Sequence, residues 1–400
     1  MSNNALQGIL ILDLTQALAG PYATQLLADL GAQVVKIERP GSGDQARGWG
    51  PPFVEGESSY FMGTNRNKRS LTLNLQDPAA RDILASLIDR ADVLVHNVPR
   101  RTTREKLGID AATVRGRNPR LVWAAISGFG LTGPEAEKPG YDVIAQGMAG
   151  TMALTGEPDT GPVRFPTPMA DITTGMYTAM GILTALFERE RSGEGQELDV
   201  ALFDSQATWL SNVASSFLAT GAAPAKRGNV HPNIAPYQPF RASDGWFNLA
   251  AGTERHWNAV VSLLNAQDSL GSDPRFATNR DRVAHRDALE LELERRFAVK
   301  PVAAWIDAFE GVGVPCGPIL PPEDSLQHPH LLAREMVVGM DHAAAGFVRS
   351  LGNPMKLSRT PPSYRTAAPT LGQHTGEILE ELGYRSEEHT SELQSLLIIS

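Results

Sequence analysis

Two apolar runs of strand length flank a helical pattern near the N-terminus, and this arrangement restricts the fold more than any other feature. Residues 9–15 read Ile-Leu-Ile-Leu-Asp-Leu-Thr, a helical pattern follows over residues 22–30, and Gly31 ends it before a second apolar run at residues 33–38. A strand, a helix and a strand at this spacing predict two parallel strands joined by a right-handed crossover. In open sheets of this kind, ligands bind beyond the carboxyl ends of the strands.

The same pattern recurs further along the chain. It predicts a strand over residues 70–75, a helix over 78–90, a strand over 92–96 and another strand over 120–126. We therefore expect the first part of the chain to fold as a doubly wound α/β domain. The glycine pattern Gly-x-Gly-x-x-Gly does not follow the first strand, so a dinucleotide site is not supported.

The length of the chain and a change in its texture predict two domains. The 400 residues exceed what one simple core accommodates. Residues 221–228, which read Gly-Ala-Ala-Pro-Ala-Lys-Arg-Gly, are interpreted as a linker. Beyond them, short strands and charged amphipathic helices alternate, as in a smaller α+β unit.

Charge and cysteine content exclude several classes of function. The formal net charge of −9 at pH 7 argues against a general nucleic-acid or anionic-membrane partner. The single cysteine, Cys316, allows no intrachain disulfide. We find no signal peptide and no uncharged stretch long enough to span a bilayer, so a cytoplasmic protein is expected.

A lone acid, Asp171, stands between a proline-rich segment and a long run of small and apolar residues. That run predicts a buried helix with Asp171 at its N-cap, where the carboxylate would accept hydrogen bonds from free backbone N–H groups and complement the helix dipole. The same groups would keep the carboxylate ionised, as a carboxylate nucleophile requires. The pattern alone favours the cap and leaves both roles open.

Basic residues follow or lie near the predicted strand ends. Any single one is more simply a solvated surface residue, but as a group in an acidic protein they indicate the capture of an anionic ligand. They are Arg39, Lys68, Arg69, Arg100, Arg101, Arg104, Lys106 and Lys138. No pair of His or Cys residues has metal-ligand spacing, so no metal site is predicted. On the simplest structural interpretation of residues 140–142, Asp142 caps a helix over residues 143–148 and Tyr141 packs beside it.

Ordered blocks along residues 6–384 resemble those of class III coenzyme A transferases, the family of formyl-CoA and carnitine-CoA transferases. The N-terminal block includes Leu12-Asp13-Leu-Thr15, Ala19-Gly-Pro21, Val35-Lys-Ile-Glu-Arg-Pro40 and Gly43-Asp44. The further blocks, in order, are Asn67-Lys-Arg-Ser70, Lys138-Pro-Gly-Tyr-Asp142, Ala170-Asp-Ile-Thr-Thr-Gly175, Gly313-Val-Pro-Cys-Gly-Pro318 and Leu371-Gly-Gln-His-Thr375.

The resemblance implies an enzyme that moves CoA from an acyl-CoA donor to a free carboxylic acid. The family's catalytic aspartate falls on Asp171, which would attack the thioester carbonyl to give an aspartyl anhydride and CoA thiolate. The thiolate would then form an aspartyl-CoA thioester, and the acceptor acid would repeat these steps in reverse. The coenzyme A thioester is a substrate, and no tightly bound cofactor is expected.

By the same matching, loops after the predicted strands would hold CoA. The matched residues are Leu18, Ala19, Arg39, Leu73, Asn74, Leu75, Gln76, Asn97, Val98, Pro99, Arg104, Lys106, Lys138, Pro139, Gly140 and Tyr141. One residue is inserted near the family's phosphate-binding base, which therefore falls on Lys106 or on the neighbouring Arg104.

The family fold implies a Rossmann-like large domain, built from both ends of the chain, with a smaller α+β domain between them. This assigns residues 1–220 and 319–384 to the large domain, 221–228 to the linker and 229–318 to the small domain. The family also implies a homodimer of interlocked rings. Residues 385–400 resemble the translation of a DNA-sequencing adapter, and we interpret them as a non-native tail.

Two departures from the family bear on specificity. Formyl-CoA transferases carry a run of glycines that closes over the intermediate, and the matching residues 231–239 lack it. This difference favours a larger acceptor, such as a dicarboxylate with succinyl-CoA as donor, over oxalate or formate. The family's α-methylacyl-CoA racemases carry a histidine where this chain has Tyr141, so a proton donor opposite Asp171 is missing and a transferase is preferred. A 2-methylacyl-CoA racemase and a non-catalytic acyl-CoA-binding protein stay as alternatives.

Overall fold

The protein is represented by a computed structural model that describes residues 4–384. The chain divides into two compact units, each of which is described by itself. The first comprises the described residues within 1–152, 164–215 and 329–400, and the second comprises residues 153–163 and 216–328. The domain bounds assigned from the sequence stay a prediction, and residues 385–400, interpreted as a non-native tail, lie outside the described residues.

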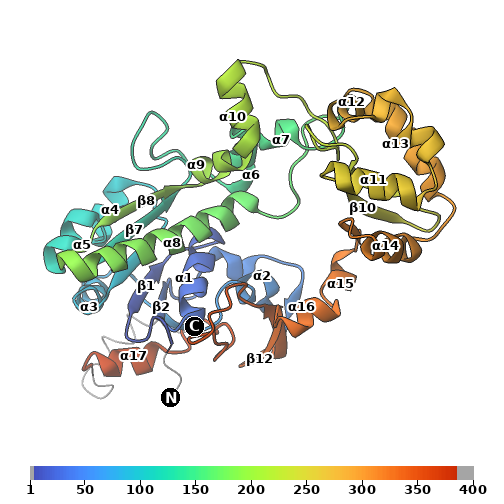
Figure 1. Cartoon of the computed structure of the whole chain (residues 1–400). Coiled ribbons are helices and arrows are strands. Elements are labelled where there is room, and N and C mark those ends of the chain that lie inside the picture. The colour runs from blue at the N-terminus through green and yellow to red at the C-terminus, as the bar shows by residue number, and fades with distance from the viewer. Residues whose placement is uncertain (1–3, 385–400) are drawn as a thin grey trace. The chain divides into compact units, whose positions relative to one another are not determined.

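A six-stranded parallel sheet forms the centre of the first unit (Figure 1). Its strand order is β5-β2-β1-β6-β7-β8, and every neighbouring pair is parallel. The strands are β1 (Leu10–Leu14), β2 (Gln33–Glu38), β5 (Lys68–Thr72), β6 (Val93–His96), β7 (Val122–Ser127) and β8 (Glu197–Ala201). The predicted parallel sheet is therefore confirmed. The strand order reverses between β1 and β6, the point at which such sheets bind ligands.

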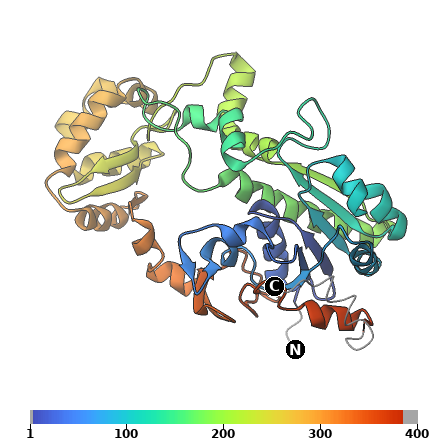
Figure 2. The same cartoon turned by 180° about the vertical axis from the view of Figure 1, so that it is seen from behind.

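Helices cover both faces of this sheet because successive residues of a strand point to opposite faces (Figures 1 and 2). In β1, Ile11 packs in the core under α1 and α8, whereas Leu12 packs in the core on the other face, under α3 and α17. These four helices are α1 (Ala19–Asp29), α8 (Met169–Ser192), α3 (Pro78–Ile88) and α17 (Thr375–Glu381).

The C-terminal part of the chain returns to β5. The amide of Ser70 donates a hydrogen bond to Nδ1 of His374 (3.2 Å), and the amide of Thr72 donates one to Oγ1 of Thr375 (3.1 Å). The remaining elements of the first unit are the 3-10 helix Gln45–Gly48, β3 (Phe53–Val54), β4 (Glu57–Ser58), α2 (Ser59–Met62), α4 (Arg101–Leu107), α5 (Ala111–Arg117), α6 (Asp142–Met148), α9 (Leu202–Ala207), the 3-10 helix Thr208–Leu210, α16 (Pro329–Ala333), β12 (Val337–His342) and β13 (Gly346–Leu351). Two helices, α7 (Thr151–Leu154) and α10 (Ser211–Thr220), each begin in the first unit and end in the second.

The second unit packs helices on a small antiparallel sheet of order β11-β10-β9. Its core includes an aromatic cluster in which Phe297 contacts Phe240, Phe247, Trp305 and Phe309 at ring-centroid distances of 5.2–5.8 Å. Its elements are β9 (Tyr237–Arg241), β10 (Trp246–Ala250), β11 (Cys316–Pro318), α11 (Glu254–Leu263), the π-helix Gln267–Gly271, the 3-10 helix Pro274–Phe276, α12 (Asn279–Ala284), α13 (Arg286–Phe297), α14 (Val302–Gly311) and α15 (Pro322–Ser325). Among residues 4–384, no helix has both the length and the hydropathy needed to cross a bilayer.

Candidate active site

Most of the residues matched to CoA contacts lie in segments at the carboxyl ends of successive parallel strands. These segments are residues 18–19 after β1, of which Ala19 begins α1, Arg39 after β2, residues 73–76 after β5, residues 97–99 after β6 and residues 138–141 between β7 and α6. Arg104 and Lys106 lie on α4, the helix that follows β6. Because parallel strands end at the same edge of a sheet, the loops share one edge. A side-chain link joins two of them, since Asn97 Nδ2 donates to the carbonyl of Gln16 and Asn97 Oδ1 accepts from its amide.

Buried charges hold the loop between β1 and α1. Asp44 accepts a hydrogen bond from the amide of Ala17 (3.0 Å), and its other oxygen lies 2.9 Å from Nζ of Lys36. Lys36 also donates to the carbonyl oxygen of Thr15 (2.9 Å). Ala17 has a φ of +72°, a conformation that costs a non-glycine residue roughly 1–2 kcal/mol. These contacts stabilise a strained loop directly before Leu18 and Ala19.

Lys68 does not belong with the bases that could capture a ligand, which corrects the expectation from the sequence. It is fully buried, and its Nζ donates to Asp13 (3.0 Å), to Oδ1 of Asn65 (2.8 Å) and to the carbonyl oxygen of Pro21 (2.8 Å). These three acceptors use all of its N–H groups. Burial lowers the pKa of Lys68 to about 8, even though Asp13 opposes that shift.

The two candidates for a phosphate-binding base differ in availability. Arg104 is buried and donates to the carbonyl oxygens of Val98 (3.0 Å) and Pro99 (2.7 Å), so it shapes the loop after β6. Lys106 is exposed. In the part of the chain that the structure describes, no hydrogen bond or ion pair engages it. Lys106 is therefore the base of the two that an external phosphate can reach.

Several other bases are already paired within the protein. Arg69 contacts Glu377 and Glu381, both on α17. Arg101 pairs with Glu105, and Lys138 with Glu135. Arg39 is exposed and, among residues 4–384, has no such partner. Arg100 is exposed and, within the same residues, its side chain has no such partner either. Of the predicted basic group, Arg39, Arg100 and Lys106 are therefore the members available to an external anion.

Two glycines bring the last of these loops to the sheet edge. A Cβ added to Gly128, just after β7, would lie 2.6 Å from the Cα of Gly140, so the backbones approach too closely for any side chain at either position. Tyr141 follows this crossing with 58% of its surface exposed. The expectation that Tyr141 packs against its helix is therefore wrong.

Asp171 is the third residue of α8, not its N-cap. The helix begins at Met169, its N-cap position is Pro168, and no side chain of the N-cap residue bonds to the helix. The predicted capping role of Asp171 is therefore wrong, because the helix starts earlier than the sequence pattern indicated. The carboxylate of Asp171 therefore does not cap its own helix.

Asp142 performs the capping role instead, from another helix. Its Oδ1 accepts a hydrogen bond from the amide of Ala170 (2.8 Å), and its Oδ2 accepts one from Nε2 of Gln146 (2.7 Å). Gln146 in turn accepts from the amide of Phe165 (3.0 Å). Asp142 was expected to cap α6, but that helix has Tyr141 at its N-cap without a side-chain hydrogen bond. The sequence offered only the spacing of Asp142 and Gln146 as a signal for this arrangement.

The carboxylate of Asp171 has no internal partner: among residues 4–384, it accepts no hydrogen bond and forms no ion pair. Burial, and then the nearby Asp142, raise the pKa of Asp171 to about 7. The prediction that backbone N–H groups keep Asp171 ionised is therefore wrong, since none of them donates to it among residues 4–384 and the amide of Ala170 donates to Asp142. At neutral pH, protonated and ionised forms of Asp171 coexist.

Tyr60, on α2, is a neighbour that the sequence did not single out. Burial, followed by the charges of Asp171 and Asp142, raises the pKa of Tyr60 to about 12. Its ring packs edge-on against Trp49 at a centroid distance of 4.8 Å. Tyr60 therefore keeps its proton near the two carboxylates. The half-buried carboxylate of Asp171, which accepts no hydrogen bond among residues 4–384, is chemically able to attack a carbonyl carbon.

Comparisons with known proteins add to this geometry. Residues 6–375 match the model of CoA-transferase family III. Succinate–glutarate CoA-transferase of Agrobacterium fabrum is 39% identical over 383 residues, covering 94% of this chain and 95% of that protein. Acetyl-CoA:oxalate CoA-transferase of Acetobacter aceti is 40% identical over 376 residues, with 94% and 95% covered. The crystal structure of a CaiB/BaiF family protein from Brucella suis superimposes with a TM-score of 0.85 at 40% identity, covering 95% of this chain and 100% of that one.

Proposed function

The chain belongs to CoA-transferase family III, and from this premise we propose that it transfers coenzyme A from an acyl-CoA to a free carboxylic acid. The observation that carries the proposal is the carboxylate of Asp171, to which no group among residues 4–384 donates a hydrogen bond and with which no cation there forms an ion pair. A carboxylate used for structure would be paired, as Asp142, Asp44 and Asp13 are.

Asp171 acts in this proposal as the nucleophile. Its oxygen bonds to the thioester carbonyl carbon, the C–S bond breaks, and CoA leaves as a thiolate. The thiolate then attacks the aspartyl carbonyl carbon and releases the donor acid, which leaves an aspartyl-CoA thioester. The acceptor carboxylate reverses the two steps. Burial supports this role because it strips the attacking oxygen of water that would otherwise have to be displaced.

Coenzyme A is proposed to bind along the sheet edge formed by the loops that end β1, β2, β5, β6 and β7. The rigid loop at Leu18 and Ala19 would contact it, and Lys106, together with Arg39, would meet its phosphates. Arg104 would act indirectly, because its guanidinium is used to hold residues 98 and 99.

A dicarboxylate acceptor with succinyl-CoA as donor is the pairing that we propose. One relative takes its name from succinate and glutarate, which agrees with this choice. A relative of similar identity is named for oxalate, so overall identity does not separate the two acids. Glutarate and oxalate therefore have to be compared directly.

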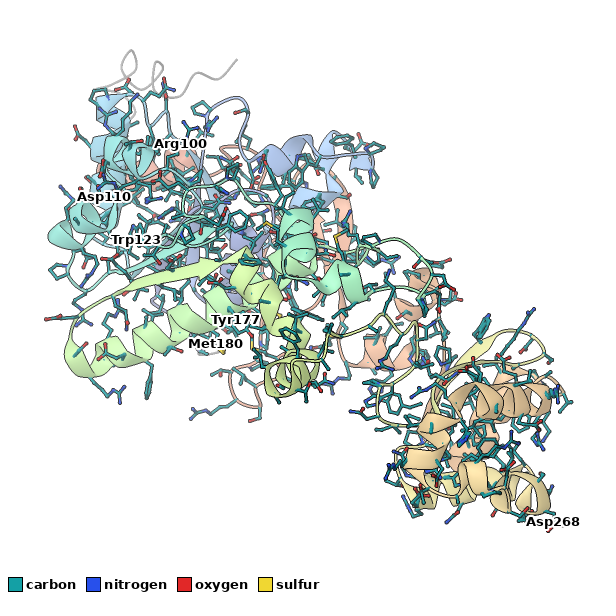
Figure 3. The ribbon with its side chains drawn as sticks, turned by 90° about the horizontal axis from the view of Figure 1, so that it is seen from above. Arg100, Asp110, Trp123, Tyr177, Met180 and Asp268 are labelled. Carbon is teal, nitrogen blue, oxygen red and sulfur yellow. The ribbon has the colours of Figure 1, made fainter. Side chains whose placement is uncertain are left out.

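The proposal includes a homodimer. Along α8, Met176, Met180 and Phe187 recur on one side of the helix and are 53%, 55% and 69% exposed. Figure 3 shows Tyr177 and Met180 on the side of α8 turned away from the sheet residue Trp123. A second copy of the chain would bury this apolar face. Interlocked rings, a Rossmann-like large domain and a cytoplasmic location complete the proposal.

The test is to incubate the enzyme with succinyl-CoA and a panel of acids, and to identify new CoA esters by mass spectrometry. Wild type should form them, and Asp171→Asn should not, whereas the matched variant Asp110→Asn, at the cap of the remote helix α5, should be unaffected. Hydroxylamine added with succinyl-CoA should label Asp171 in wild type. Exchange of the substrate α-proton in D2O without any acid, and no new ester, would establish a racemase instead. Turnover that survives in Asp171→Asn would exclude Asp171 as nucleophile.

A further inference from the structure

We propose that Asp142 is a positioning residue whose negative charge, fixed beside Asp171, favours the covalently modified forms of Asp171 over its free carboxylate. The inference rests on the proposed role of Asp171 as nucleophile. It assigns a function to an acid that would otherwise be a helix cap and no more.

The hydrogen bonds of Asp142 prevent it from moving away. Oδ1 is held by the amide of Ala170, the residue next to Asp171, and Oδ2 by Gln146, which is itself 1% exposed. Gln146 is fixed in turn by the amide of Phe165, in the segment that leads into α8. Both carboxylate oxygens accept from N–H groups, which suits the ionised form of Asp142. The charge therefore lies at a set place in the first turn of α8.

Little in the surroundings neutralises that charge. Among residues 4–384, the cation within 4.0 Å of Asp142 is Arg164, whose side chain is 47% exposed and therefore screened by water. Tyr60, on α2, is affected by the charges of both carboxylates and keeps its proton, because burial and these charges raise its pKa to about 12. Within the described part of the chain, Asp171 forms no ion pair. The main electrostatic neighbour of Asp171 is thus a like charge, which destabilises its ionised form.

The proposed reaction removes this repulsion at its first step. When the oxygen of Asp171 bonds to the carbonyl carbon and CoA departs as thiolate, the negative charge passes from Asp171 to sulfur, and Asp171 becomes part of a neutral anhydride. When the thiolate attacks the aspartyl carbonyl, the charge leaves with the donor carboxylate, and the aspartyl-CoA thioester is neutral. Asp142 therefore raises the energy of the free carboxylate and leaves that of both intermediates nearly unchanged.

The test measures the aspartyl-CoA thioester that wild type and variants form with succinyl-CoA alone, quenched in acid and read by intact-protein mass spectrometry. Asp142→Asn removes the charge but keeps an oxygen for the amide of Ala170. We expect the ratio of thioester to free enzyme to fall roughly tenfold, equivalent to one pKa unit of interaction. The acid limb of the pH profile of kcat/KM should move to lower pH by a similar amount.

Two further variants separate charge from structure. Gln146→Met breaks the hold on Oδ2 but keeps the charge, and Asp110→Asn repeats the Asp-to-Asn change at the remote cap of α5, where Asp110 accepts from the amide of Thr113. Asp110→Asn should not move the acid limb. Gln146→Met leaves the bond from the amide of Ala170 in place and should move the acid limb by much less than Asp142→Asn does. The inference is overturned if Asp142→Asn leaves both readouts at the level of Asp110→Asn, or if Gln146→Met reproduces its shift. Wild type that forms no thioester at all would instead overturn the proposed function.

Discussion

Asp44 accepts a hydrogen bond from the amide of Ala17 over 3.0 Å, and this bond joins a buried ion pair to the loop proposed to bind CoA. The same carboxylate accepts from the amide of Ala46 and pairs with Lys36. Neither side chain of the pair is exposed to solvent. The loop conformation is therefore maintained by two side chains that are fully buried.

We expect Asp44→Ala to raise the KM for acyl-CoA several-fold while the KM for the acceptor acid changes little, because Ala17 loses the bond that holds its left-handed conformation. Stability should fall by about 3–5 kcal/mol, since buried Lys36 loses the carboxylate of its ion pair. Asp44→Ala combined with Lys36→Met should recover much of the stability but not the KM. Urea unfolding and steady-state kinetics measure the two effects, and a double variant with normal KM would contradict this role of the bond.

The pH dependence of activity should follow Asp171. Its pKa is raised to about 7, so kcat/KM should rise tenfold per pH unit below pH 7 and level off above it, because the ionised form attacks. A profile that stays flat down to pH 5 would contradict this expectation.

The titration of Asp171 should also make the stability of the protein depend on pH, with stability falling over the pH range in which activity rises. An acid whose pKa is raised on folding keeps its proton in the folded state over a range in which the unfolded chain has lost it, so stability falls as pH rises from the ordinary value near 4 to about 7. Asp171→Asn removes this cost. Its gain in stability over wild type should therefore grow between pH 4 and pH 7 and then remain constant, as measured by urea unfolding at several pH values. Asp110→Asn should show no such growth, because the pKa of Asp110 is lowered in the folded state.

Gly175 is where α8 packs directly on the start of α1. A Cβ at this position would lie 2.7 Å from the carbonyl oxygen of Ala19, a backbone atom that cannot turn aside. Gly175→Ala should therefore cost about 1–3 kcal/mol of stability and displace Ala19, weakening CoA binding. Gly116→Ala is the matched control, because it lies within α5 with open space around it and should stabilise by roughly 0.5–1 kcal/mol. Equal effects of the two changes on stability and on the Kd for CoA would contradict the close packing.

The exposed face of α8 should control the oligomeric state. Met180→Glu and Phe187→Glu place a charge on the surface that a second copy would bury, so each should shift sedimentation from dimer to monomer at micromolar concentration. Leu291→Glu, on α13, is the control because Leu291 is similarly exposed, at 52%, and lies in the other unit. Wild type that sediments as a monomer would contradict the proposed dimer.

The sequence was sufficient for features that depend on local order along the chain. Spacing of apolar runs predicted the parallel sheet, and the run after Asp171 predicted α8. It was insufficient for contacts between distant segments. The bond from the amide of Ala170 to Asp142 spans 28 residues and depends on how α6 meets α8, so the capping acid was misidentified. Burial of Lys68 likewise depends on Asp13, which is 55 residues away, and a strand-end position alone did not indicate it.

The return of α17 to β5 has a consequence for how the chain is made. Thr72 and Thr375, joined by a hydrogen bond, are 303 residues apart, so the part of that face that α17 covers stays open until those 303 residues have been synthesised. At synthesis rates of roughly 5–20 residues per second, that interval is on the order of 15–60 s. During biosynthesis this part of the sheet thus lacks its α17 cover for tens of seconds. Chaperones that bind exposed apolar strands can act in that period.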